Sequence, residues 1–198
     1  MYELPVSITL SGKLHKIRNN GDFRIVLDCF SALEDVELSA QERLFASLII
    51  FYDELETIDD IYTVLGDDLE QAVTEMYSFF NGGSESSQTH EEYKLVDWQQ
   101  DEQLIVSAVN KVANTEIRAE SYIHWWTFLS YYMAVGECAL SSVIHIREKI
   151  VKGKKLEKYE QEFRRANPQY FRWNNKTIQA REAEELVRKL WNGGESDG

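Results

Sequence analysis

The sequence has few of the residues that interrupt helices. Of its 198 residues, 10 are glycine and 2 are proline, about half of the roughly 12% share that these two residues usually take together. Because turns between short strands use both residues, the shortage favours a mainly α fold. Cysteine is scarce as well. Cys29 and Cys138 lie far apart and show neither a CxxC nor a Cys/His spacing, which argues against a disulfide framework and a zinc site, and we expect no cofactor.

Basic side chains and long apolar runs are also in short supply. Lys and Arg number 21 against 34 Asp and Glu, and the formal net charge is −13. Binding to a nucleic acid through bulk charge requires clustered Lys and Arg, so we expect no nucleic-acid partner. The longest apolar stretches, such as residues 48–52, are far shorter than the ~18 residues that span a membrane, and residues 1–5 do not resemble the start of a signal peptide. We therefore expect a cytoplasmic protein without a membrane partner.

Apolar and aromatic side chains, in contrast, are plentiful. Hydrophobic residues make up 43% of the chain and aromatic residues 12%, which is enough to form a core. Apolar residues that alternate on both sides of a Ser11-Gly12 turn predict an N-terminal β-hairpin. These residues are Val6, Ile8 and Leu10 before the turn, and Leu14 and Ile17 after it.

The rest of the chain predicts two helical halves joined by a flexible linker. Residues 1–81 contain the hairpin and the first helices, and residues 82–93 form the linker because they are rich in Gly and Ser. Residues 94–166 form an aromatic-rich helical half. Residues 167–198 form a C-terminal helix, over residues 177–191, and a tail.

Capping residues indicate where the first helices begin. Asp22 precedes an apolar face, Ser39 has Glu42 three positions later in a capping box, and Asp67 or Asp68 can cap the next helix. In the second half, further helices are expected from residue 101, over the aromatic run 122–133, over residues 140–150 and over residues 154–166.

Charge is unevenly distributed along the chain. Residues 1–90 carry 5 basic and 17 acidic side chains, whereas residues 147–198 carry 13 basic and 9 acidic ones. An acidic front and a basic tail suit charge pairing, either head to tail between copies or within one chain. A solvated basic helix explains the tail equally well, since exposed ion pairs contribute only about 0.2–1 kcal/mol each.

Two acidic pairs are the strongest sign of catalytic chemistry. Asp59-Asp60 begins a motif close to the DDxxD cluster with which terpene synthases bind magnesium and diphosphate, and Asp67-Asp68 begins an approximation to their second motif. A Mg-dependent all-α enzyme is therefore one hypothesis. However, the fifth position of the first motif is Thr63, and the two motifs are too close in sequence to face each other across a cavity. Helix capping explains these acids more simply, and we expect no enzyme.

Several stretches of the sequence resemble a bacteriophage family. A short hairpin is followed by the helix start Asp22-Phe23-Arg24, and residues 38–43 follow. Further on, a histidine and two tryptophans precede a phenylalanine, and residues 144–147 form an Ile-Arg segment. Over roughly residues 4–165 this order resembles the phage gp-fifteen family. The residues of its second motif are His124, Trp125, Trp126 and Phe128.

The resemblance implies a tail assembly chaperone of long-tailed phages of Gram-positive hosts. Such a protein binds and solubilises the tape measure protein, recruits major tail tube subunits, and forms a homo-oligomer. It acts in the host cytoplasm and is absent from the mature virion. A permanent structural tail protein is an alternative. Trp125, Trp126, Phe128 and Tyr132 are candidates for lining a client groove, although such aromatic side chains are more often core residues.

Overall fold

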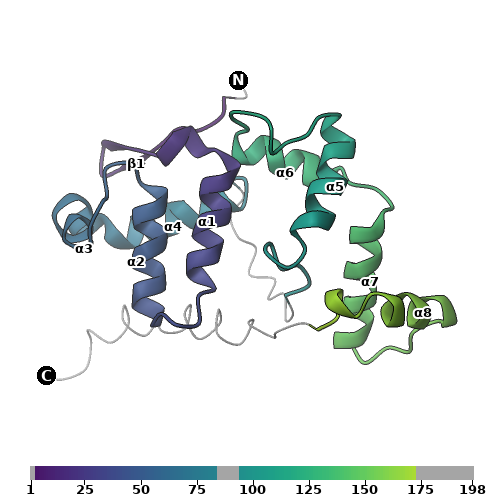
Figure 1. Cartoon of the computed structure of the whole chain (residues 1–198). Helices are drawn as coiled ribbons and strands as arrows, with labels where there is room; N and C mark the ends of the chain where they lie inside the picture. The colour runs from purple at the N-terminus through teal and green to yellow at the C-terminus, as the bar shows by residue number, and fades with distance from the viewer. Residues whose placement is uncertain (1–2, 84–93, 173–198) are drawn as a thin grey trace, which may run out of the picture. The chain divides into compact units, whose positions relative to one another are not determined.

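Most of the described chain is α-helical, and a two-stranded antiparallel hairpin lies at its N-terminal end (Figure 1). The computed structural model describes residues 3–83 and 94–172. It confirms the expected mainly α fold with a short β-hairpin. In chain order the elements are β1 (Ser7–Leu10), β2 (Lys13–Lys16), η1 (Arg18–Gly21), α1 (Phe23–Leu33), α2 (Ala40–Phe51), α3 (Ile58–Asp60), η2 (Ile61–Leu65), η3 (Gly66–Asp68), α4 (Leu69–Phe80), α5 (Glu102–Ala113), α6 (Trp125–Met133), α7 (Ala139–Val151), α8 (Lys158–Ala166) and η4 (Pro168–Tyr170).

The described residues cluster into two units. The first contains residues 3–83 together with Tyr122–Trp126, and the second contains residues 94–121 and 127–172. Tyr122–Trp126 belongs to the first unit although it lies within the predicted second half. The boundaries drawn from the sequence stay predictions, because residues 84–93 and the predicted helix at 177–191 lie outside the described residues.

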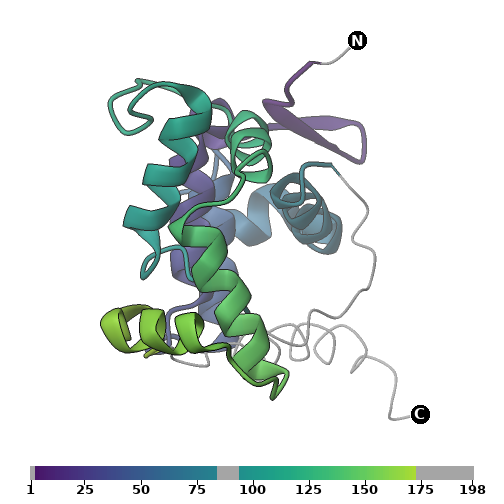
Figure 2. The same ribbon diagram turned by 90° about the vertical axis from the view of Figure 1, so that its right-hand side faces the viewer.

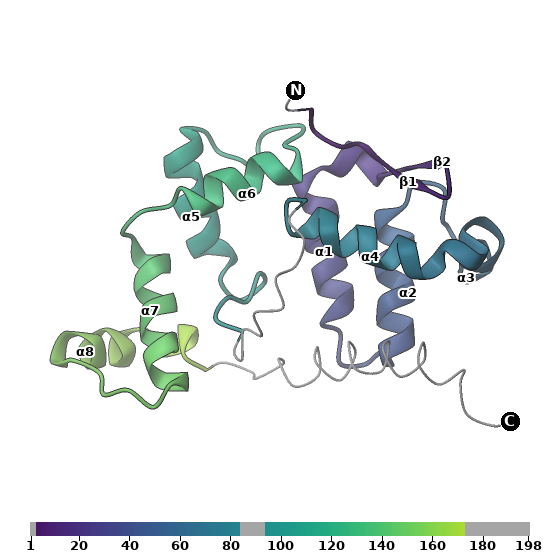
Figure 3. The ribbon, with the colours of Figure 1, turned by 180° about the vertical axis from the view of Figure 1, so that it is seen from behind.

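In the first unit, α1 and α2 pack side by side, and α4 crosses both of them (Figure 3). Their facing surfaces bury apolar side chains, each contributing about 1.5–3 kcal/mol relative to an exposed position. The most deeply buried core residues of this unit include Leu10, Val26, Leu48, Phe51 and Met76.

None of the described helices is both long enough and apolar enough to cross a bilayer.

Local capping sets the starts of α1 and α2 as the sequence predicts. The Asp22 carboxylate accepts the backbone N–H of Arg24 at 3.0 Å. Ser39 and Glu42 form the expected capping box, with distances of 3.3 and 2.8 Å. Asp68 occupies the residue before α4, but its side chain accepts the Ser11 hydroxyl at 2.5 Å and makes no capping bond.

Arg18 closes the end of α2. Its guanidinium donates to the carbonyl oxygens of Ile49, Ile50, Tyr52 and Leu55 at 2.8 to 3.1 Å. The last carbonyls of a helix have no partner within the helix and carry partial negative charge, so a cation here both satisfies and neutralises them.

In the second unit, a buried ion pair joins α5 to α7, and α8 lies across one end of α7 (Figure 2). The carboxylate of Asp101, at the start of α5, accepts the Arg147 guanidinium at 2.5 and 2.8 Å. Arg147 also donates to the carbonyl oxygens of Leu95 and Tyr170. One α7 side chain therefore fixes three segments of this unit.

Two predicted helix starts are wrong. The aromatic helix begins at Trp125, not Tyr122, and α8 begins at Lys158, not residue 154. For the first of these there is a clear reason. The Ile123 backbone is already paired, because its carbonyl accepts the Phe23 N–H at 2.9 Å and its N–H donates to Asp22 at 3.0 Å.

Candidate functional site

The two motifs that carry the phage resemblance lie against each other in the first unit. Asp22 and His124 form an antiparallel β-bridge, and the Tyr122 hydroxyl donates to the carbonyl oxygen of Asn20 at 2.9 Å. Asp22 and Ile123, which share a hydrogen bond, are 101 positions apart in the sequence. The extended segment before α6 therefore closes over the start of α1, and we take this junction as the candidate functional site.

The Asp22 carboxylate holds the junction together. It accepts the backbone N–H groups of Arg24 and Ile123, each at 3.0 Å, and the Arg24 guanidinium at 3.0 Å. The Arg24 guanidinium also lies 4.5 Å above the centre of the Phe23 ring, a cation–π arrangement. Asp22 and Phe23 are buried, while Arg24 remains partly exposed. One side chain thus caps a helix and anchors a distant segment.

The hydrogen bonds of His124 define its tautomer. The Trp126 backbone N–H can only donate, so Nδ1 of His124 accepts it at 3.0 Å. Nε2 then carries the proton and donates to the carbonyl oxygen of Pro5 at 2.9 Å. Burial lowers the pKa of His124 below its ordinary value, although the Pro5 carbonyl and the Asp22 charge oppose this effect. The ring is therefore held neutral, as a structural link rather than a free base.

Acidification should weaken the junction through His124. The pKa of His124 in the folded state is lower than the ordinary 6.5 of the unfolded chain. Below pH 6.5 the unfolded chain therefore takes up a proton more readily than the folded one. The contribution of the neutral ring to stability is complete above pH 6.5 and is lost as the pH falls through the folded-state pKa. We expect the urea midpoint of the wild type to drop between about pH 7.5 and about pH 5.5. His124→Gln should be less stable at the higher pH and should show a shallower decline. Parallel curves for the two proteins would contradict this role.

The two tryptophans bind the C-terminal end of α4. The Trp125 indole N–H donates to the carbonyl oxygen of Phe80, and that of Trp126 donates to the carbonyl oxygen of Phe79, both at 2.9 Å. Gly83 has a φ of +78°, and a Cβ atom there would lie only 2.8 Å from the Trp126 ring. Gly83 therefore has a role besides following the end of α4. Because it has no side chain, the Trp126 ring can pack directly against its backbone.

The candidate client-binding aromatics differ in accessibility. The side chains of Trp125 and Phe128 are each only 1% exposed, so their rings form part of the core and no partner reaches them in this structure. Trp126 and Tyr132 are partly exposed. Within the second unit, Tyr132 packs against Trp98 with ring centres 5.3 Å apart and ring planes at 47°, and the neighbouring Met133 is 82% exposed.

The acidic pairs near residue 60 are used for local structure. The Asp60 carboxylate accepts two backbone N–H groups and the hydroxyl of Thr57, and these bonds lower its pKa. Asp59 and Asp67 are exposed, and Asp68 binds Ser11. Within residues 3–83 and 94–172, no three His, Cys, Asp or Glu side chains converge as a metal site. The geometry therefore gives the magnesium-enzyme hypothesis no support.

Sequence reasoning missed the surface that receives the second motif. Phe79 contacts both His124 and Trp126, with ring centres 5.5 and 5.9 Å apart. Gly21 has a φ of +75°, and a Cβ atom there would lie 2.7 Å from the Phe79 ring. The available signal was the Gly21-Asp22 pair itself, since a glycine directly before a helix cap can mark close approach by another segment.

A family model described as "Bacteriophage Gp15 protein" matches residues 1–171. No curated protein and no solved structure is significantly similar to the chain. The matched range includes both motifs of the junction and the Asp101–Arg147 pair.

Proposed function

The chain belongs to the bacteriophage Gp15 protein family, and on this premise we propose that it is a non-enzymatic tail assembly chaperone that binds the tape measure protein. In this proposal it keeps the tape measure chain soluble in the host cytoplasm, promotes recruitment of major tail tube subunits, and is absent from the mature virion. The observation that carries the proposal is the family match, which spans residues 1–171 of the 198.

The surface of the described residues suits such a role. Apolar side chains are exposed on and just before the hairpin and at the end of α6, and they offer contacts for the apolar face of a helical client. Each contact is small, but many copies of a weak binder along one long polymer gain through effective concentration. The net charge of −13 favours solubility of the coated client. These residues are Leu4 and Val6 just before β1, Leu14 in β2, and Met133 at the end of α6.

The proposal is tested with the tape measure protein encoded by the same phage. We expect the full chain to suppress light scattering when this client is diluted from denaturant, and to elute with it in gel filtration. Met133→Asp should weaken both effects without changing the unfolding curve, because Met133 is 82% exposed. Val36→Asp is the matched control, since Val36 is also exposed, at 53%, but lies in the loop between α1 and α2.

Three outcomes would count against the proposal. Absence of any complex with the client, together with unchanged scattering, would remove the chaperone role. Detection of the chain in purified virions at structural copy number would indicate a permanent tail protein instead. Magnesium binding by calorimetry that is lost in Asp59→Asn would revive the enzyme hypothesis.

A further inference from the structure

A basic surface lies on α8 and the loop before it, in the second unit. Residues 147–172 carry 9 Lys and Arg against 4 Asp and Glu, in a chain whose net charge is −13. A depression of about 480 Å³ beside α8 is lined by Leu156, Gln161, Arg164 and Arg165. We call this the α8 surface. Its exposed cations are Lys154, Lys155, Lys158, Arg164 and Arg165.

The α8 surface is held in place by a buried carboxylate. Glu160 is only 1% exposed and accepts Lys149 Nζ, from α7, at 2.7 Å and the Glu157 backbone N–H at 2.7 Å. The bond from Lys149 lowers the pKa of Glu160, so the carboxylate stays charged. Because α8 is fixed on α7, Arg164 and Arg165 are presented from an ordered helix.

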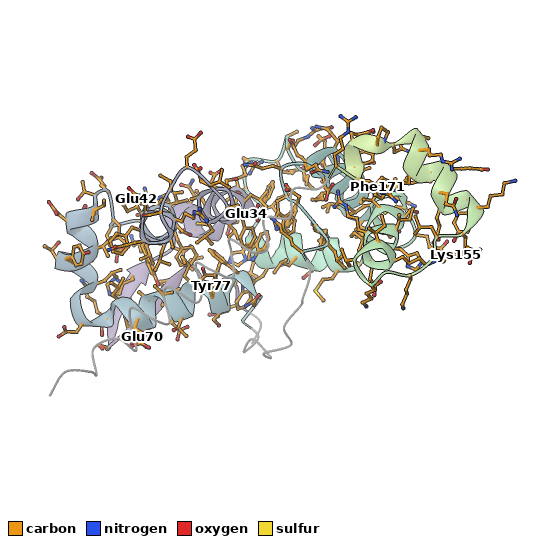
Figure 4. All side chains as sticks on the ribbon, turned by 90° about the horizontal axis from the view of Figure 1, so that it is seen from below. Glu34, Glu42, Glu70, Tyr77, Lys155 and Phe171 are labelled. Atoms are coloured by element: carbon orange, nitrogen blue, oxygen red, sulfur yellow. The ribbon has the colours of Figure 1, made fainter. Side chains whose placement is uncertain are left out.

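A surface of opposite character lies in the first unit. Residues 3–83 carry 16 Asp and Glu against 5 Lys and Arg. Where α3 runs into η2, Ile58 and Tyr62 are 50% and 55% exposed, and they lie four positions apart, on one side of the turn. Exposed Asp59 lies between them in the sequence, and exposed Asp67 follows in η3. We call this the α3 surface; Figure 4 marks Glu70, just beyond it, and Lys155, beside α8.

We propose that the α8 surface of one copy binds the α3 surface of a second copy. The two surfaces are complementary in charge, because Arg164 and Arg165 line the depression and Asp59 and Asp67 are exposed on the α3 surface. Leu156 and the side-chain stems of the two arginines can contact the exposed Ile58 and Tyr62. The large depression can accept one aromatic side chain, and Tyr62 is the exposed aromatic residue of the α3 surface. Since each chain carries both surfaces, the contact is head to tail and allows rings or filaments.

The overall negative charge does not prevent this contact. At 0.1 M salt, charges more than about 10 Å apart are largely screened. Attraction between the two local surfaces then outweighs repulsion between distant acidic groups. The association should therefore be strongest at moderate ionic strength and should weaken as added salt screens the surfaces themselves. The family resemblance implies a homo-oligomer, and this inference adds which two surfaces meet. It does not depend on binding of the tape measure protein.

Charge reversal on the full chain tests the contact. Sedimentation velocity of the wild type should show concentration-dependent association that about 0.5 M salt reduces. Arg164→Glu with Arg165→Glu, and separately Asp59→Lys with Asp67→Lys, should each weaken it at least about tenfold, as expected for removing close charge pairs. Lys16→Glu with Lys111→Glu is the matched control. It changes the net charge as much as the arginine pair does, at exposed positions elsewhere, and should leave association unchanged.

Mixing the two reversed variants gives the decisive result. The arginine variant keeps a native α3 surface, and the aspartate variant keeps a native α8 surface. In an equimolar mixture these two surfaces should bind each other, which gives a 1:1 complex that cannot grow further. Circular dichroism establishes that both variants are folded. The proposal is overturned if the wild type is monomeric at every concentration, if the control weakens association as much as the variants do, or if two folded variants fail to form the 1:1 complex.

Discussion

Replacing Arg147 with methionine should lower the free energy of unfolding by about 3–5 kcal/mol, the usual cost of leaving a buried charge without its partner. The side chain is 1% exposed and its partner Asp101 is 0% exposed. Besides the bidentate pair, the guanidinium donates to the carbonyl oxygens of Leu95 and Tyr170. Methionine fills much of the volume but satisfies none of these acceptors. Urea unfolding followed by circular dichroism measures the loss.

A double-mutant cycle separates the ion pair from the packing. Asp101→Leu alone leaves the guanidinium charge buried and should be about as destabilising as Arg147→Met. Combining the two substitutions removes both charges, so the double variant should be clearly more stable than the sum of the two losses predicts. Arg147→Lys retains the charge but cannot reproduce the planar bidentate contact, and it should remain destabilising. Strictly additive losses would show that the pair acts only through packing.

The parts of the fold that the sequence predicts correctly are those determined by neighbouring residues. The starts of α1 and α2 follow from Asp22 and Ser39, because a cap and the N–H groups that it accepts are within three positions of each other. The hairpin turn follows from Ser11-Gly12 for the same reason, since Gly12 has a φ of +84°. Such features require no knowledge of distant contacts.

The register of the hairpin shows where local reasoning stops. The sequence suggests that Leu14 continues the apolar pattern, but Leu14 is 67% exposed and His15 is buried. In the observed pairing, His15 lies opposite the buried Ile8 and therefore on the inner face. There its Nδ1 atom lies 2.5 Å from a carboxylate oxygen of Glu54. Glu54 follows α2, so the carboxylate that pairs with the buried His15 comes from outside the hairpin. The hairpin residues alone therefore do not predict that His15 is buried.

The candidate site could be predicted as two motifs but not as one place. Resemblance to the phage family singled out Asp22-Phe23-Arg24 and His124-Trp125, yet no spacing rule relates segments that are 101 positions apart. The same applies to Asp101 and Arg147, which are 46 positions apart. Contacts of this length depend on how the whole chain packs, so the structure was needed to show that the motifs hold each other.

Replacing Trp125 with alanine should be the most damaging change at the junction, with an expected loss of about 3–5 kcal/mol. The ring is 1% exposed, lies 5.9 Å from the Phe30 ring centre to centre, and donates its N–H to the Phe80 carbonyl oxygen. Alanine would leave a cavity in the first unit and an unsatisfied carbonyl oxygen at the end of α4. Thermal and urea unfolding measure the change.

Trp126 provides the matched control one residue away. It donates to the neighbouring carbonyl oxygen of Phe79 at the same 2.9 Å, but its ring is partly exposed. If burial is what makes Trp125 important, Trp126→Ala should cost clearly less stability, although both variants lose one indole hydrogen bond. Trp125→Phe, which keeps most of the volume and loses the bond, should fall between wild type and Trp125→Ala. Equal losses for the two alanine variants would mean that the hydrogen bonds to α4, rather than the buried ring, hold the two motifs together.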